Sequence, residues 1–224
     1  MFAAALPAEP RPEPTAIVSQ YVAISEAHRS RLQGSSMQVE IEAELPKLHR
    51  QGRLSALRKI SDLGRITYEA LRFEGDRSIK NDVIARYLTA EVESRNGSAG
   101  SLAVTPENYK FRYKGQSDKD GRPVHVFQLS PRKKRVGLFT GELWIDARSF
   151  LPVRESGRFV KNPSIFLKRV EFVREYEERE GVAVPRRIDT LIDTRLVGKA
   201  RLKVDFTSVS LVRPPDVALL SDSQ

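Results

Sequence analysis

The chain has 224 residues, and its 38 Lys and Arg outnumber its 29 Asp and Glu, which gives a net charge of +9. With 40% hydrophobic and 30% charged residues, the composition is that of a globular protein and excludes collagen-like, coiled-coil and mucin-like chains. The absence of cysteine excludes disulfides, thiolate chemistry, cysteine-held metal centres and a lipidated cysteine anchor.

Residues 1–14 are expected to be disordered and to lie outside the fold, because they are rich in proline. Ala3-Ala4-Ala5 and Leu6-Pro7-Ala8 both have the small-residue form of a signal-peptidase site. The segment therefore fits either the remnant of an export signal or a Pro-rich N-terminus. Nowhere does the sequence contain the run of about 20 apolar residues that a membrane-spanning helix needs.

The first regular elements are a helix and a strand. Ile17, Val18 and Tyr21 begin an apolar stripe of helical period, with Thr15 as N-cap and Gly34 after the last turn. From residue 37 to residue 45, apolar residues alternate with Gln and Glu, which predicts a strand with one buried and one wet face.

The remainder of the chain is predicted to be mostly strand, interrupted by one helix at Ser78–Glu93 whose apolar residues recur at three- and four-residue spacing. In all we count about eleven strands joined by short turns. Short connections indicate an antiparallel meander, and long twisted strands tend to curl. The sequence thus predicts a mainly β (α+β) fold: an incomplete, strongly curved antiparallel β-barrel in one domain, residues 15–213, closed by the N-terminal and inserted helices, with a flexible tail at 214–224.

Motifs for catalysis or for a resident metal or cofactor are not found, so we expect no enzyme, no cofactor and no metal. Asp118 and Asp120 are better explained by a hairpin turn than by a metal site. His125 would need a facing carboxylate to act as a base, and a structural role on the barrel wall is favoured. Asp146 ends a strand, where hydrogen bonding is favoured over acid–base work.

Basic residues form a tract at Pro131–Arg135 and a row at Lys110, Arg112 and Lys114. The tract fits either a nucleic-acid patch or a solvated hairpin turn, and we favour the turn. A platform for stacking bases needs aromatic residues on the wet face, whereas here Tyr109, Phe111 and Tyr113 fall on the buried side. No nucleic-acid partner is expected. The charge would act outside, toward anionic lipid headgroups or an acidic partner.

The buried face of the strands is the informative feature for function. If the helices do not fill it, an elongated apolar cavity able to hold a lipid-like ligand remains, and a fully packed core is the equal alternative. The candidate cavity-lining residues are Met37, Val39, Ile41, Phe111, Tyr113, Phe139, Leu143, Ile145, Val170, Phe172, Tyr176 and Phe206.

Three motifs carry a family resemblance: Tyr109-Lys110-Phe111, Gly141-Glu142-Leu143-Trp144-Ile145-Asp146 and Leu151-Pro152-Val153-Arg154. With the N-terminal helix and the alternating strand before them, they resemble the periplasmic lipoprotein-carrier superfamily, the LolA/LolB-like and RseB-like fold. The resemblance spans about Thr15 to Val212. Two features depart from the carrier pattern: the excess of basic residues and the segment Leu54–Arg77.

The resemblance implies an exported, periplasmic, soluble binding protein that holds lipid or lipoprotein acyl chains in its barrel, as a lipoprotein-sorting or lipid-transfer carrier. The alternative is an envelope sensor or assembly module that binds protein partners with the same fold and no catalysis. The partners expected are therefore acyl chains and a membrane-surface or envelope protein, and the chain is expected to be a monomer.

Overall fold

The computed structural model of the chain describes residues 13–96, 102–162, 167–195 and 198–211. Residues 1–12 of the predicted disordered segment 1–14 and the predicted tail at 214–224 lie outside the described residues; the prediction is wrong for Pro14, which begins the first helix. Within the described residues, no helix combines the length and the apolar character needed to cross a membrane.

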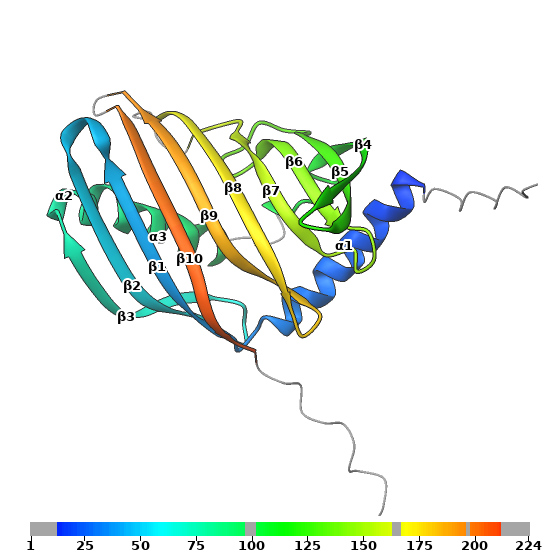
Figure 1. Cartoon of the computed structure of the whole chain (residues 1–224), viewed down its shortest axis with the longest axis horizontal. Helices are drawn as coiled ribbons and strands as arrows, with labels where there is room; N and C mark the ends of the chain where they lie inside the picture. Colours follow the sequence, from blue (N-terminus) through cyan, green and yellow to red (C-terminus); the bar gives the residue numbers. More distant parts are fainter. Residues whose placement is uncertain (1–12, 97–101, 163–166, 196–197, 212–224) are drawn as a thin grey trace, which may run out of the picture.

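A single ten-stranded antiparallel sheet dominates the structure (Figure 1), so the predicted mainly β fold is confirmed, with ten strands in place of about eleven. The order across the sheet is β3-β2-β1-β10-β9-β8-β7-β6-β5-β4, which leaves β3 and β4 as its edges and the barrel open. The strands are β1 Ser36–Leu45, β2 Arg50–Ile60, β3 Ile66–Gly75, β4 Tyr109–Lys119, β5 Arg122–Pro131, β6 Phe139–Asp146, β7 Pro152–Phe159, β8 Leu167–Arg179, β9 Val182–Thr194 and β10 Lys199–Ser210.

The period-2 pattern of the sequence determines which face of the sheet is buried. Ile41 lies opposite Leu54 on one side and Val204 on the other, and all three are buried. The neighbouring Glu42 lies opposite Arg53 and Lys203 on the other face. The sheet therefore has an apolar inner face and a charged outer face.

Two helical segments cover the inner face. Helix α1, Pro14–Arg31, buries Ile17, Val18 and Tyr21. The second segment is α2 Arg77–Ile79, a π-helical turn at Lys80–Ile84 and α3 Ala85–Asn96, in place of the single predicted helix. The predicted Thr15 N-cap is wrong: the N-cap position is Glu13, which makes no side-chain cap, because Pro14 already occupies the first turn and needs no donor satisfied.

The sheet is strongly curved. Lys119 of β4 lies 3.4 Å from Glu175 of β8, although three strands separate β4 from β8. In a flat sheet that separation would be roughly 19 Å, four spacings of about 4.8 Å. At the tightest part, Gly141 of β6 lies opposite Gly157 of β7, and a Cβ on Gly141 would come within 1.9 Å of the Ser156 carbonyl oxygen. The missing side chains let β6 and β7 approach closely.

Substitution of Gly141 by Ala should therefore destabilise the protein. The clash is with backbone, which cannot rotate away, so we expect a loss of about 2–3 kcal/mol in the free energy of unfolding. Urea denaturation followed by circular dichroism measures it. Gly121→Ala is the comparison, since nothing lies within 4 Å of a Cβ there and only its positive φ opposes the change. Equal losses in both variants would contradict a close approach at Gly141.

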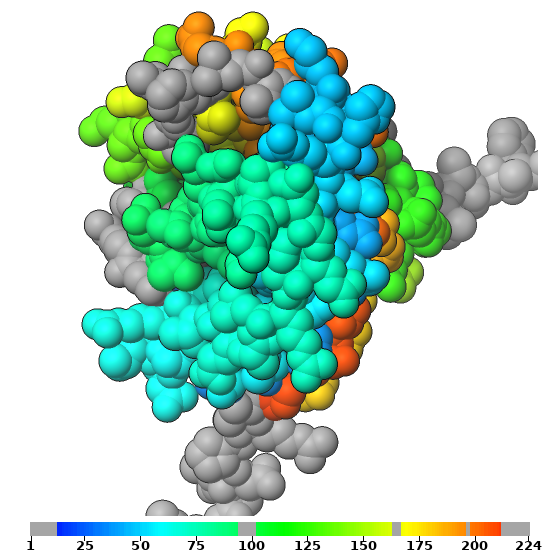
Figure 2. Space-filling view, turned by 90° about the vertical axis from the view of Figure 1, so that its left-hand side faces the viewer, coloured from blue at the N-terminus to red at the C-terminus, as the bar shows by residue number. Residues whose placement is uncertain are grey.

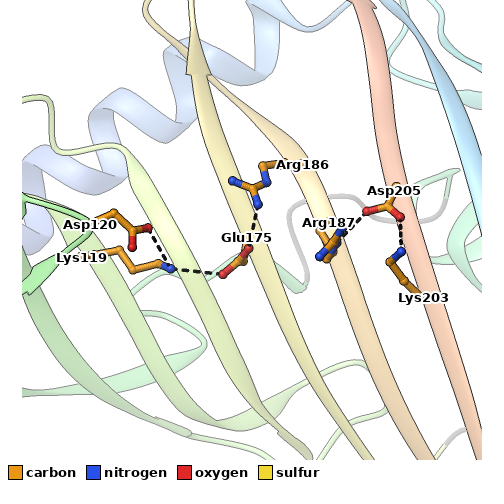
Figure 3. Close-up of polar contacts among 7 residues, drawn as sticks. All are labelled: Lys119, Asp120, Glu175, Arg186, Arg187, Lys203 and Asp205. Carbon is orange, nitrogen blue, oxygen red and sulfur yellow. Dashed lines mark hydrogen bonds and ion pairs between the residues drawn. The ribbon is translucent and has the colours of Figure 1, made fainter.

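Ion pairs join residues of the same strand and of different strands of the sheet (Figure 3). Arg187 of β9 donates to Asp205 of β10 at 2.6 Å, and Lys203 lies 2.9 Å from the same carboxylate. Glu175 of β8 contacts Lys119 and Arg186. Each of these basic residues thus has a carboxylate beside it.

Asp205 makes stability depend on pH. Burial alone would raise its pKa, but the bonds from Lys203 and Arg187 outweigh burial and hold the pKa of Asp205 below its ordinary value of 3.8. A lowered folded pKa stabilises the protein above the unfolded pKa, and that contribution is lost as pH falls through the folded pKa. Asp205→Asn should cost about 1 kcal/mol at neutral pH.

That cost should disappear in acid, where wild-type Asp205 is itself protonated. Thermal melting of both proteins between neutral pH and a pH below 3.8 gives the comparison. A difference in melting temperature that stays constant over this range would show that Asp205 acts through packing and not through its charge.

Candidate functional site

The predicted cavity-lining residues all lie on the inner face, but they belong to two separate groups. Met37, Val39, Ile41 and Phe206 are in one apolar cluster, around β1, β2 and β10. A second cluster, around β4, β5 and β6, contains Phe111, Tyr113, Phe139, Leu143, Ile145 and Phe172. Val170 and Tyr176 of β8 lie in neither: Val170 is buried and Tyr176 is half-buried.

The first cluster is covered by the α2–α3 segment, which buries Ile79 and Ile84 against the sheet. An ion pair fixes α3 there. Arg58 of β2, whose side chain is 4% exposed, lies 3.0 Å from Glu91 of α3, and the Tyr68 hydroxyl of β3 donates to the same carboxylate. Burial and the nearby Glu91 charge raise the pKa of Tyr68, so this hydroxyl stays a donor at physiological pH.

The second cluster is covered by α1 and is rich in aromatic rings. Phe139 packs edge to face on Phe172, with ring centroids 5.0 Å apart, and also packs on Tyr109 at 5.4 Å. Burial raises the pKa of Tyr109 to about 12, and its hydroxyl accepts the Phe139 backbone N–H. Aromatic pairs of this geometry add to the stability that burial already provides.

Between the two clusters, polar side chains reach the inner face. Glu155 of β7 lies opposite Arg174 of β8 and accepts a 2.8 Å hydrogen bond from it, and the Arg174 guanidinium also donates to the Tyr176 hydroxyl at 3.4 Å. Burial opposes the charge of Arg174, but Tyr176 and Glu155 outweigh it and keep the pKa of Arg174 above its ordinary range. We call these three residues the polar seam.

The polar seam is partly exposed to solvent. Glu155 is only 7% exposed, yet 34% of the Arg174 side chain is exposed. Thr190 and Ile192 of β9, which face the same side, are also only half-buried. Figure 2 shows a hollow beside the atoms of α3, with atoms in the colours of β8 and β9 visible inside it. The inner face is therefore closed under each helical segment and more open between them.

Two further hollows lie on the surface of the protein. One of about 360 Å³ follows the exposed side of α3, between Asn81 and Glu93. The other, about 20 Å³, lies beside Arg122 and Asp146 and is lined in part by Tyr176. Of the predicted residues, only Tyr176 lines either one.

The residues considered for catalysis have structural partners. Nδ1 of His125 lies 3.1 Å from the Tyr113 hydroxyl, and burial lowers the pKa of His125. Asp146 accepts the backbone N–H groups of Arg148 and Ser149, which confirms its predicted hydrogen-bonding role, and Asp118 accepts that of Gly121, which confirms its predicted turn role. Among the described residues, no group of His, Cys, Asp and Glu is placed to hold a metal ion.

Sequence reasoning missed Glu155, Arg174, Arg58 and Glu91, because charged residues in a strand or helix were assigned to the wet face. The position of Arg174 contained a usable signal: it lies at the same alternation as Val170, Phe172 and Tyr176, on the inner face. Arg58 likewise follows Leu54 and Ala56.

No family model matches the chain, and no curated protein does. Among solved structures, it is similar to a DUF1329 family protein from Desulfovibrio piger, with 12% identity, a TM-score of 0.48, and 92% of this chain and 94% of that chain covered. A LolA superfamily protein from Nitrosomonas europaea matches with 14% identity and a TM-score of 0.40, over 92% of this chain and 96% of that one. MucB matches with 12% identity and a TM-score of 0.33, over 87% and 94%.

These structures include the LolA-like and RseB-like proteins that the sequence resembles, and the likeness concerns the fold. The likeness does not identify a ligand for this chain.

The polar seam gives a test of how the interior is held. Glu155→Gln leaves the Arg174 charge without its partner; because 34% of the Arg174 side chain is exposed to water, the free energy of unfolding should fall by about 1–2 kcal/mol, less than for a fully buried pair. Glu155→Leu combined with Arg174→Met removes both charges and should recover most of that loss. Urea denaturation of the single and double variants measures both changes in the free energy of unfolding. If the double variant is as unstable as the single one, the contribution comes from hydrogen bonding that the apolar pair cannot replace.

Proposed function

We propose that the protein is a non-enzymatic binding protein that holds acyl chains of a lipid or lipoprotein on the inner face of its open barrel. The observation that carries the proposal is the partial opening of the apolar inner face between its two helical covers. The cores of the two clusters under α1 and the α2–α3 segment are buried, whereas four inner-facing residues of β8 and β9 are half-buried: Arg174, Tyr176, Thr190 and Ile192.

The chemistry of the opening suits an amphiphile. Ile192 and Phe172 give the middle strands an apolar wall, and the polar seam places a guanidinium and a phenol beside it. A hydrocarbon chain would follow the wall toward one of the two clusters, and the polar end of the ligand would remain near Arg174 and Tyr176. The predicted lining residues, from Met37 to Phe206, are the surfaces that the chain would reach.

Whether a helical cover can be displaced by a ligand depends on two free energies: that gained by burying the ligand and that lost by exposing the cover. Each buried methylene group contributes about 0.8 kcal/mol, so a long acyl chain gains roughly 10 kcal/mol on transfer from water. Displacing α3 exposes partly buried side chains such as Tyr87 and Leu88, each contributing about 1.5–3 kcal/mol when fully buried, and separates Arg58 from Glu91. The two quantities are comparable, which suits a ligand that is loaded and released reversibly.

The proposal includes export to the periplasm, a monomeric state, and acyl chains as the ligand. The small-residue segments at Ala3–Ala5 and Leu6–Ala8 support export. His125 and Asp146 are both engaged in structural hydrogen bonds, and the proposal assigns neither of them a catalytic role.

The test uses two neighbouring residues of β9. Ile192 faces the interior and Leu191 the outer surface, and both are half-buried. Ile192→Gln should weaken binding of a fluorescent fatty acid by about tenfold, the equivalent of roughly 1.4 kcal/mol, because it places an amide on the apolar wall. Leu191→Gln should change it by less than about twofold, which corresponds to roughly 0.4 kcal/mol.

The ligand itself can be sought by extracting protein purified from cells with organic solvent and analysing the extract by mass spectrometry. Recovered lipid at a stoichiometric amount supports the proposal. A protein that retains no lipid and does not bind the fatty acid probe contradicts it. Crosslinking that instead captures one defined envelope protein, equally well in Ile192→Gln, would favour the alternative of a sensor or assembly module.

A further inference from the structure

A cluster of basic residues marks one corner of the sheet, where the connection between β5 and β6 meets the beginning of β4. Lys110 lies opposite Ser130, next to the start of that connection. The cluster consists of Lys110, Arg112, Arg132, Lys133, Lys134 and the apolar Val136, and we call it the basic corner.

The basic corner is a structured surface. The backbone N–H of Arg132 donates to the Asn108 carbonyl at 2.7 Å, and the Arg135 guanidinium donates to the Asn108 side chain at 2.9 Å. Arg132 also donates to the Pro106 carbonyl at 2.6 Å. The connection is thus fixed against the segment before β4, and Lys133 and Lys134 are exposed on it.

Charge pairing distinguishes the basic corner from the part of the outer face formed by β1, β2, β9 and β10. On β2, β9 and β10, the cations Arg53, Arg187 and Arg201 form ion pairs with acids of a neighbouring strand. Within the described ranges, Lys110, Arg112, Lys133 and Lys134 take part in no ion pair. Their charge remains available to an external anionic partner.

Two observations select the kind of partner. Val136 is 44% exposed beside the lysines, and an apolar residue among cations suits the boundary between lipid headgroups and acyl chains. Strand addition of an acidic peptide at the β4 edge is disfavoured, because a bulge between Tyr113 and Gly115 interrupts the regular geometry of that edge.

We propose that the basic corner docks on a membrane surface that contains anionic lipids. Lys133, Lys134 and Lys110 contact headgroup phosphates there, and Val136 enters the layer beneath them. The surface lies outside the apolar interior, so it is independent of the acyl-chain site and can be tested without it. For a protein that also carries acyl chains, the same contact would bring it to the place where they are loaded or released.

The test is co-sedimentation of the whole protein with vesicles of phosphatidylcholine, with and without phosphatidylglycerol. Wild type should bind only the vesicles with phosphatidylglycerol, and less tightly as salt is raised. Lys133→Gln with Lys134→Gln should weaken binding by roughly 25-fold, since each lysine near an anionic surface strengthens binding about fivefold. Val136→Asp should also weaken it.

The control variant is Arg201→Gln with Lys203→Gln. It also removes two positive charges, but from the ion-paired outer face of β10. It should change binding by less than about twofold, because those charges are already neutralised. Circular dichroism melts check that each variant is folded. Equal losses in the two double variants would overturn the proposal, since binding would then follow net charge alone.

Failure of wild type to bind anionic vesicles would also overturn it. So would strong competition by polyglutamate together with full binding in Val136→Asp, a result that would point to an acidic protein as the partner.

Discussion

The alternation of apolar and charged residues along ten neighbouring strands is the constraint on which the rest of the structure depends. It gives the sheet one face that must leave water and one that must stay in it. Because the sheet is not closed, β3 and β4 never pair, and its inner face needs cover from elsewhere in the chain. Helix α1 and the α2–α3 segment provide that cover, each over one half of the sheet.

Curvature divides the interior in two. Gly141 and Gly157 allow β6 and β7 to approach closely, and the sheet bends enough to bring Lys119 to Glu175. Each half then packs its own cluster, and the strands between them carry the Glu155–Arg174 pair. A charged pair at this position separates two apolar regions that would otherwise merge, and it is retained where water can still reach the arginine.

Much of the fold could be predicted from the sequence because period-2 alternation is a local signal. Met37 to Leu45 shows it without interruption, and the strand runs from Ser36 to Leu45. The distribution of inner-facing residues between two clusters is not local, because it depends on how far strands distant in sequence bend toward each other. Composition also misled at particular positions: Arg58 and Arg174 are as polar as their outer-facing neighbours, yet their place in the alternation puts them inside.

The two helical covers are held by different contacts: α1 mainly by apolar side chains, and α3 also by a buried ion pair. Helix α1 buries Ile17, Val18 and Tyr21, and at its C-terminal end the Arg31 guanidinium donates to the Glu180 carbonyl. Helix α3 is also fixed by the buried pair of Arg58 and Glu91, with Tyr68 on the same carboxylate. A buried pair adds little net stability but demands one geometry, because either charge left alone in the interior is costly. Helix α3 is thus seated in one position or displaced as a unit.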